Sequence, residues 1–148
     1  MITSSTVSID APADLVWNVF TDVEQWPQWT ASVTRLAGLD GPDLAVGRRF
    51  EIDQPRLPTL RWEVTDVVPQ SSWTWVQHPP GGVTTAHHDV VETAEGTTVV
   101  RQELDQRGIV GAAVAVLMRR TTKRYLAMEG DGLKARCEEL RNLRGPVT

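Results

Sequence analysis

The stretch from Ile9 to Trp29, IDAPADLVWNVFTDVEQWPQW, carries most of the information about the fold of this 148-residue chain. It follows directly on TVSI (Thr6 to Ile9), whose alternation of polar and apolar residues predicts a short first strand. Asp10 as an N-cap and Pro12 in the first turn favour a helix immediately afterwards. Apolar residues recur along that helix at the spacing of a single face: Leu15, Val16, Val19, Phe20 and Val23.

The same stretch concentrates tryptophan: it holds three of the chain's 6 Trp, although the chain has only 2 Phe and 1 Tyr. Because one indole ring buries about 150–250 Å², the simplest expectation for Trp17 is a place in the core. Pro27 disfavours helix at Trp26, so we expect a new short segment to begin there.

The middle of the chain has the pattern of strands separated by turn residues. The links between them are short, and short links favour antiparallel pairing. The predicted strands are Ala31 to Leu39, Arg48 to Asp53, Leu60 to Val68, Trp73 to Gln77, Val83 to Glu92 and Thr97 to Gln106.

A long helix is predicted to close the chain, from about Ile109 to Arg144. One face carries Leu126, Leu133, Cys137 and Leu140 at helical spacing. The two glycines of EGDG (129–132) predict a kink or a break, since glycine costs about 1 kcal/mol relative to alanine within a helix. Strands followed by a long helix define an α+β fold.

Composition excludes several classes of function. The net charge of −4 argues against a broad nucleic-acid surface. The apolar run from Ile109 to Met118 is shorter than the roughly 20 residues that span a bilayer. The basic run Arg119 to Arg124 predicts a solvated flank; binding to an anionic membrane is the weaker alternative, because the remaining surface must be acidic on balance. The single Cys137 and the absence of a signal-peptide pattern at the start favour a cytoplasmic protein.

The chain resembles the START/Bet v 1-like (SRPBCC) superfamily, and most closely its polyketide cyclase/dehydrase and lipid-transport group. The resemblance implies one domain over residues 1–148 with the helix-grip fold. In that fold, a curved antiparallel sheet of six to seven strands surrounds the C-terminal helix, and two short helices lie near the N-terminus. A mostly apolar cavity is implied between helix and sheet. The residues that carry the resemblance are IDAPADLVWNVFTDVEQWPQW, GRRF (47–50), LRWEVTDVVPQSSWTW (60–75), GTTVV (96–100) and MEGDGLKARCEEL (128–140).

Aromatic residues are the first candidates to line this cavity. The resemblance places Trp26 and Trp29 near its rim, and Phe50 belongs to one of the matching motifs. Trp62 and Trp75 lie on strands where they alternate with other inward candidates. On the helix side, Ala115, Met118 and Thr122 continue the leucine face toward smaller residues, which predicts open space under the first half of the helix. The loops at 40–43 and 54–58 are candidate gates.

Histidine and charged residues give further candidates. Neighbouring residues of a strand point to opposite faces, so only one of His87 and His88 can face the cavity, and the pattern leaves open which one. The same geometry argues against a shared metal, and no cofactor is expected. Arg101 and Glu103 share a face that either meets water or forms a polar cavity floor with the two paired to each other.

Three functions remain compatible with these patterns. The leading hypothesis is binding, and possible transport, of a hydrophobic small molecule such as a lipid or polyketide. The second is a polyketide aromatase or cyclase in which an Arg or His assists proton transfer. The third is a protein–protein module, which would show a large apolar surface patch and no internal void. Each is compatible with a monomer or a homodimer.

Overall fold

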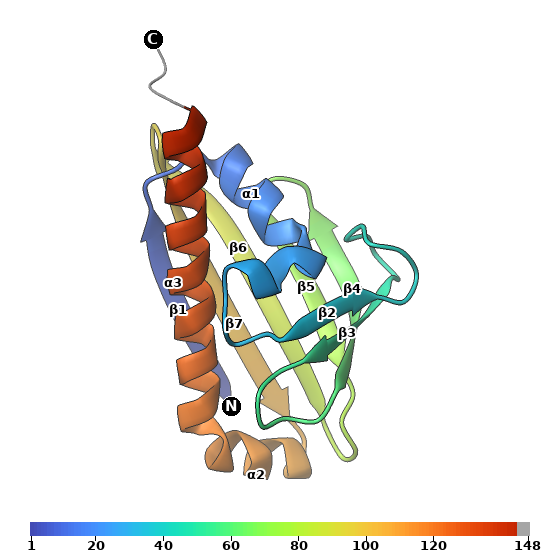
Figure 1. The fold of residues 1–148 in the computed structure, drawn as a ribbon. Coiled ribbons are helices and arrows are strands. Elements are labelled where there is room, and N and C mark those ends of the chain that lie inside the picture. Colours follow the sequence, from blue (N-terminus) through green and yellow to red (C-terminus); the bar gives the residue numbers. More distant parts are fainter. Residues whose placement is uncertain (145–148) are drawn as a thin grey trace.

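The computed structural model describes residues 1–144 and contains one seven-stranded antiparallel sheet with the long helix lying along it (Figure 1). The strands follow the order β1-β7-β6-β5-β4-β3-β2. This arrangement confirms the predicted α+β, helix-grip fold. The elements are β1 (Ile2–Ile9), α1 (Ala13–Thr21), the 3₁₀ helix η1 (Val23–Gln28), β2 (Arg35–Gly38), β3 (Arg49–Asp53), β4 (Leu60–Val68), β5 (Ser72–Gln77), β6 (Val83–Ala94), β7 (Thr97–Arg107), α2 (Ile109–Leu117) and α3 (Arg119–Arg144).

The first two strands differ in length from their predictions. β1 begins at Ile2 rather than Thr6, because all of Ile2 to Ile9 pairs with β7 despite the polar run TSST. β2 covers only Arg35 to Gly38 of the predicted segment from Ala31, since residues 31–32 form a turn and the strand pairing begins at Arg35. In both cases the strand begins where its backbone starts to pair with the neighbouring strand, β7 for β1 and β3 for β2.

Alternation along β6 and β7 separates an inner from an outer face. Residues of β6 that face the core are Thr84, Ala86, His88 and Val90, and those of β7 include Thr98, Val100 and Gln102. This register settles two alternatives: His88 points inward, and Arg101 points outward, where its guanidinium lies 3.1 Å from the Glu103 carboxylate.

The start of α1 differs from the expected capping. Pro12 is the N-cap residue and no side chain caps the helix. The backbone N–H of Asp10 instead donates to a Glu138 carboxylate oxygen at 2.9 Å, which ties the end of β1 to α3. Pro27 also lies inside η1 rather than starting a new segment. Its fixed φ is compatible with a short 3₁₀ helix. The helix ends with a hydrogen bond from the Trp29 backbone N–H to the Trp26 carbonyl.

An aromatic cluster explains why tryptophan is concentrated near the N-terminus. The indole N–H of Trp26 donates to the Phe20 carbonyl at 2.9 Å, and the two rings stack 5.6 Å apart. Both rings also contact Trp73 of β5 edge-on. Trp17 is buried, as predicted. α1 and η1 therefore join the inner face of the sheet mainly through large flat side chains.

The C-terminal helix breaks at Met118 and not at the predicted glycines. Met118 still donates to the Val114 carbonyl, at 2.8 Å, but it ends α2, which turns across the lower end of the sheet, while α3 runs along it (Figure 1). Gly130 and Gly132 lie inside an unbroken α3. Leu133 and Cys137 are buried and Leu140 is partly buried, as the leucine face predicted.

Gly132 is retained within α3 because the helix passes against the backbone of the N-terminal segment. A Cβ added at Gly132 would lie 2.0 Å from the Trp29 carbonyl oxygen. A Cβ at Gly130 would lie 3.6 Å from Val7, an ordinary contact. Gly132 is therefore required by packing, whereas Gly130 is not.

We predict that Gly132→Ala lowers the free energy of unfolding by about 2–3 kcal/mol, because α3 must move away from a backbone carbonyl. Gly130→Ala is the matched control, expected to be neutral or to stabilise by up to about 1 kcal/mol through helix propensity. Urea unfolding followed by tryptophan fluorescence measures both. Equal effects of the two substitutions would contradict this account of Gly132.

Candidate functional site

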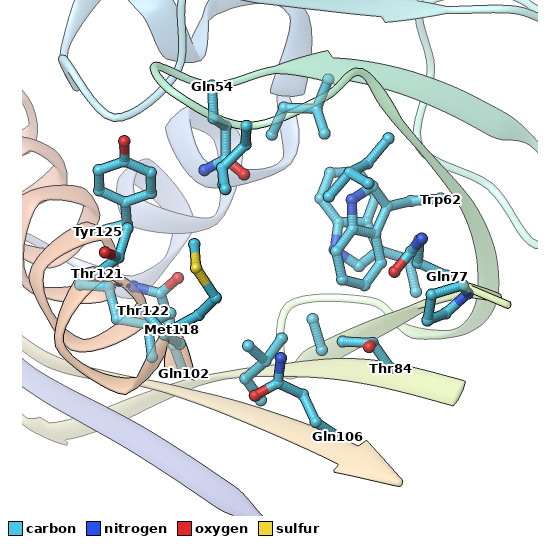
Figure 2. Close-up of a pocket in the computed structure, with 18 of the residues that line it drawn as sticks. Gln54, Trp62, Gln77, Thr84, Gln102, Gln106, Met118, Thr121, Thr122 and Tyr125 are labelled. Carbon is cyan, nitrogen blue, oxygen red and sulfur yellow. Dashed lines mark hydrogen bonds between the residues drawn. The ribbon is translucent and has the colours of Figure 1, made fainter. Parts of the chain in front are cut away.

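A cavity of about 310 Å³ lies between the inner face of the sheet and the helices α2 and α3. Figure 2 shows Met118, Thr122 and Tyr125 on one side and Trp62 and Gln77 on the other. The helix side of the cavity runs from Val110 to Glu129, which includes the first half of α3. The predicted open space under the first half of the helix is present. The apolar sheet residues around it are Ile52, Leu60, Trp62, Trp75, Ala86 and Leu104.

Six of the residues predicted to line a cavity are brought together here. Trp62 and Trp75 stack with ring centroids 5.4 Å apart and form one wall. Trp26 and His88 come from η1 and β6, while Met118 and Thr122 come from the α2–α3 junction and α3. The set that lines the cavity is Trp26, Trp62, Trp75, His88, Met118 and Thr122.

Two predicted aromatic residues lie elsewhere. Phe50 is fully buried and packs on the Trp75 ring, 6.1 Å away, so it supports the wall without lining the cavity. Trp29 is turned toward a second, smaller hollow of about 270 Å³ between α1 and α3, together with Leu15 and Arg136. The contact of its backbone with α3 at Gly132 holds it there.

Three further candidates also lie outside the cavity. His87 is on the outer face, where Nδ1 lies 2.6 Å from the Thr74 hydroxyl and Nε2 lies 2.9 Å from Asp89. Arg101 points outward and does not line the cavity, although its ion-pair partner Glu103 contributes to the lining. Ala115 is buried but does not line the cavity, because the break at Met118 rotates α2 so that Val110 and Val114 face it instead.

A set of neutral polar side chains was not anticipated. They stand on the strands β5 to β7, on α3 and, for Gln54, in the loop after β3, and Figure 2 labels all of them. Inward alternation next to buried residues is the signal that could have identified those on β6 and β7. The set is Gln54, Gln77, Thr84, Gln102, Gln106, Thr121 and Tyr125.

Two buried polar atoms of this lining have no hydrogen-bond partner among the described residues: the side-chain oxygen of Gln102 and the indole N–H of Trp62. Gln102 is only 2 % exposed, and its amide nitrogen donates to the Leu126 carbonyl at 3.4 Å. Because an unsatisfied buried group costs about 1–3 kcal/mol, a bound molecule that satisfied these two atoms would gain affinity.

Glu129 is the only carboxylate-bearing side chain of α3 that lines the cavity. It is 7 % exposed, and its one hydrogen bond is a long one, 3.5 Å, from the Ser32 hydroxyl. Burial raises the pKa of Glu129 to about 8, and the Ser32 hydrogen bond opposes this shift only weakly. At neutral pH the carboxyl is therefore mostly protonated and can donate a hydrogen bond.

His88 has the opposite shift. Burial lowers the pKa of His88 to about 3, so the ring is neutral at neutral pH. Its Nδ1 lies 3.1 Å from the Trp73 carbonyl, which assigns the proton to Nδ1 and leaves the lone pair on Nε2. The ring stacks on the Trp73 ring with centroids 3.7 Å apart. In the sheet, His88 of β6 lies opposite Gln102 of β7.

The loop that connects β3 and β4 forms part of the cavity wall. Gln54, Leu57 and Pro58 line the cavity, and the Tyr125 hydroxyl of α3 donates to the Pro55 carbonyl. This loop is one of the two predicted gates. The other predicted gate, at residues 40–43, does not contribute to the cavity lining.

Comparison with known proteins identifies the family. A family model described as polyketide cyclase/dehydrase and lipid transport matches residues 2–138, and the chain belongs to this family. No curated protein matches the chain in sequence. The resemblance to the START/SRPBCC superfamily is confirmed.

Solved structures share the fold at low identity. A START superfamily protein from Mycobacterium smegmatis is 19% identical, with 94% of this chain and 98% of that chain covered and a TM-score of 0.72. The ZhuI aromatase/cyclase from Streptomyces sp. R1128 is 17% identical over 99% of each chain, with a TM-score of 0.77. A norcoclaurine synthase from Thalictrum flavum is 13% identical over 95% of this chain and 96% of that one, also with a TM-score of 0.77.

We predict that Glu129→Gln gains stability relative to the wild type as pH rises. In the wild type, the unfolded chain releases the Glu129 proton near pH 4.5 while the folded chain keeps it to about pH 8. The free energy of unfolding therefore falls across this window, by about 1.4 kcal/mol for each unit of pKa difference. Below pH 6.5, the buried His88 acts in the opposite direction, so urea unfolding from pH 6.5 to 9 isolates Glu129.

Glu138→Gln is the control for this measurement. The ammonium of Lys134, 2.6 Å away, holds the pKa of Glu138 below its ordinary value. Both folded and unfolded chains are then ionised above pH 6.5, and the cost of this substitution should not vary with pH. A flat difference for Glu129→Gln would show that its carboxyl is ionised in the folded protein.

Proposed function

We propose that this protein binds an uncharged, largely apolar small molecule that carries hydrogen-bonding groups. The observation that supports this most directly is the cavity, with its aromatic wall and its two unpartnered polar atoms on Gln102 and Trp62. A volume of about 310 Å³ is within the range of small-molecule sites. Burial of apolar surface, at about 25 cal/mol per Å², supplies the affinity, and the polar atoms set the orientation.

The electrostatics of the lining favour an uncharged ligand. Among the described residues that line the cavity, none is Lys or Arg, so no cation is available to pair with a carboxylate or phosphate. Besides Glu129, the lining includes the carboxylate of Glu103, which is already paired with the outward Arg101. His88 is neutral and Glu129 mostly protonated at neutral pH. Moving an unpaired charge into such a site is costly, so a fatty-acid anion is disfavoured relative to an alcohol, a phenol or a ketone.

The loop of residues 54–58 forms part of the cavity wall and is a candidate gate. Its attachment on the helix side is the hydrogen bond from Tyr125 to the Pro55 carbonyl. Arg56 in this loop has a φ of 66°, a backbone conformation unusual for a residue other than glycine. We propose that this loop opens for exchange and closes over the bound molecule.

The test is a titration at pH 7 followed by tryptophan fluorescence, with decanol and decanoate as a pair that differs in charge and naringenin as an aromatic phenol. We expect saturable binding of decanol and naringenin and at least tenfold weaker binding of decanoate. Equal affinity for decanol and decanoate would contradict the charge argument, and silence for all three would contradict the proposed site.

Substitutions at Ala86 and Gln102 locate the binding, and Ala94→Leu is the control. Ala86→Leu fills the cavity and should abolish the titration, whereas Ala94→Leu, at an exposed position on the same strand, should not. Gln102→Leu should weaken naringenin at least several-fold while leaving the free energy of unfolding equal or higher, because it removes an unsatisfied buried oxygen. A loss of stability with no change in affinity would make Gln102 structural.

A second candidate function, acid–base catalysis on a ketone, is favoured by His88 and Glu129 together. The two groups line one cavity and their pKa values are displaced in opposite directions. Such a pair offers a base and an acid at the same pH. Nε2 of His88 would take a proton from the carbon next to a carbonyl, Glu129 would give its proton to the carbonyl oxygen, and the product is the enol. The polyketide cyclase/dehydrase description of the family is compatible with a step of this type.

Deuterium exchange at the carbon next to the carbonyl of 1-tetralone, followed by proton NMR, tests this candidate. We expect exchange faster than buffer, reduced at least about 100-fold by His88→Gln or Glu129→Gln. The rate should fall above about pH 8, where Glu129 ionises. Exchange at the buffer rate in wild-type protein that binds the ketone would leave binding as the function.

The third hypothesis, a protein–protein module, predicted a large apolar surface patch together with the absence of an internal void. The cavity between the sheet and the helices α2 and α3 is such a void, and we do not propose this function.

A further inference from the structure

Helix α2 leaves most of its apolar side chains in water. Every residue from Ile109 to Leu117 is apolar or glycine. The exposed fraction is 92% for Ile109, 68% for Val116 and 83% for Leu117. A helix that is apolar on all sides is ordinarily buried, so this exposure suggests that something covers it.

The two sides of α2 have different surroundings. Val110 and Val114 line the cavity, and Ala115 is buried. The exposed residues recur at helical spacing and therefore form one continuous stripe along the helix. We call this stripe the outer face of α2; it consists of Ile109, Ala112, Ala113, Val116 and Leu117.

The position of α2 is set by backbone packing at its start. Gly108 has a φ of 95°, and a Cβ added there would lie 2.5 Å from the Gly81 carbonyl oxygen. Val110 in turn packs against Gly81 in the turn between β5 and β6. α2 is thus held across the lower end of the sheet (Figure 1). None of the residues of its outer face lines the cavity.

Positive charge gathers directly after this helix. Arg119, Arg120, Lys123 and Arg124 are all exposed at the start of α3, and none forms an ion pair within residues 1–144. No Asp or Glu lies between Asp105 and Glu129 in the sequence. The region is therefore basic, although the chain as a whole has a net charge of −4.

We propose that the outer face of α2 and these four cations dock the protein on an anionic lipid bilayer. The aliphatic stripe would lie in the interfacial plane and the cations on the lipid phosphates, the pattern of interfacial amphipathic segments. A second copy of the chain would cover the aliphatic stripe but would bring the same four cations close to their own copies, so charge complementarity favours the bilayer. No described helix is long and apolar enough to cross a membrane, so the contact is peripheral.

Docking would also place the cavity next to the lipid. Val110 and Val114 line the cavity and are also partly exposed, next to the face of the same helix that would meet the bilayer. The sequence suggested a solvated flank for residues 119–124; the exposed helix beside them is what changes that interpretation. The proposal stands on this surface and does not depend on which molecule the cavity holds.

The test is co-sedimentation of the full chain with phosphatidylcholine vesicles, with and without phosphatidylglycerol. We expect binding to the anionic vesicles only, weakened by high salt. Val116→Asp/Leu117→Asp and Arg119→Gln/Arg120→Gln should each reduce partitioning at least about tenfold, since each cation near an anionic surface contributes about 1 kcal/mol. Because all four positions are exposed, circular dichroism should show unchanged folding.

Matched controls lie at the other end of α3. Leu143→Asp changes an aliphatic side chain that is 76% exposed, and Arg141→Gln removes an exposed cation; neither should affect partitioning. Equal loss in the controls would show non-specific charge binding and overturn the proposal. Absence of wild-type binding would also overturn it, and a dimer in light scattering that Leu117→Asp dissociates would assign the outer face to a second copy instead.

Discussion

The contact of α3 with the Trp29 backbone is the constraint on which the rest of the architecture depends. Gly132 lets the helix axis come close to this corner. About one turn earlier Glu129 meets Ser32, and the residue after Gly132, Leu133, enters the core. The second half of α3 is thereby packed directly on the sheet and on α1. The first half has no such contact, and the space beneath it is the cavity. One missing methyl group thus separates a closely packed end from an open end.

Burial without charge pairing gives the cavity its chemical character. His88 and Glu129 are both held in uncharged forms by the same cause, removal from water, although burial moves their pKa values in opposite directions. These two groups thus add polar capacity without adding charge, and they give the cavity one proton donor and one proton acceptor. The proposed recognition of hydroxyl and carbonyl groups on an apolar molecule rests on this character.

Periodicity explains why most of the strands and the leucine face of the last helix could be predicted, and also where prediction failed. Alternation identified Trp62 and Trp75 as sharing a face with buried neighbours, and both line the cavity. It could not choose between His87 and His88, because a shift of one residue exchanges the faces and only the pairing of β6 with β7 sets the register. Phe50 and Trp29 were misplaced for a related reason. The pattern indicated that both rings face inward, but it could not show that Phe50 would pack behind Trp75 or that Trp29 would face the hollow between α1 and α3.

The sequence by itself determined the order of elements, the antiparallel sheet and the family, because these follow from local patterns and from motifs spread over most of the chain. Tertiary structure alone decided where the last helix breaks, which face of β7 meets water and that α2 carries an exposed apolar stripe. The glycines of EGDG illustrate the difference. Local propensity marks them as a weak point of the helix, yet a carbonyl from residue 29 is the reason Gly132 is there, and the break occurs at Met118 instead. Such outcomes depend on contacts between residues far apart in the chain, which no local pattern contains.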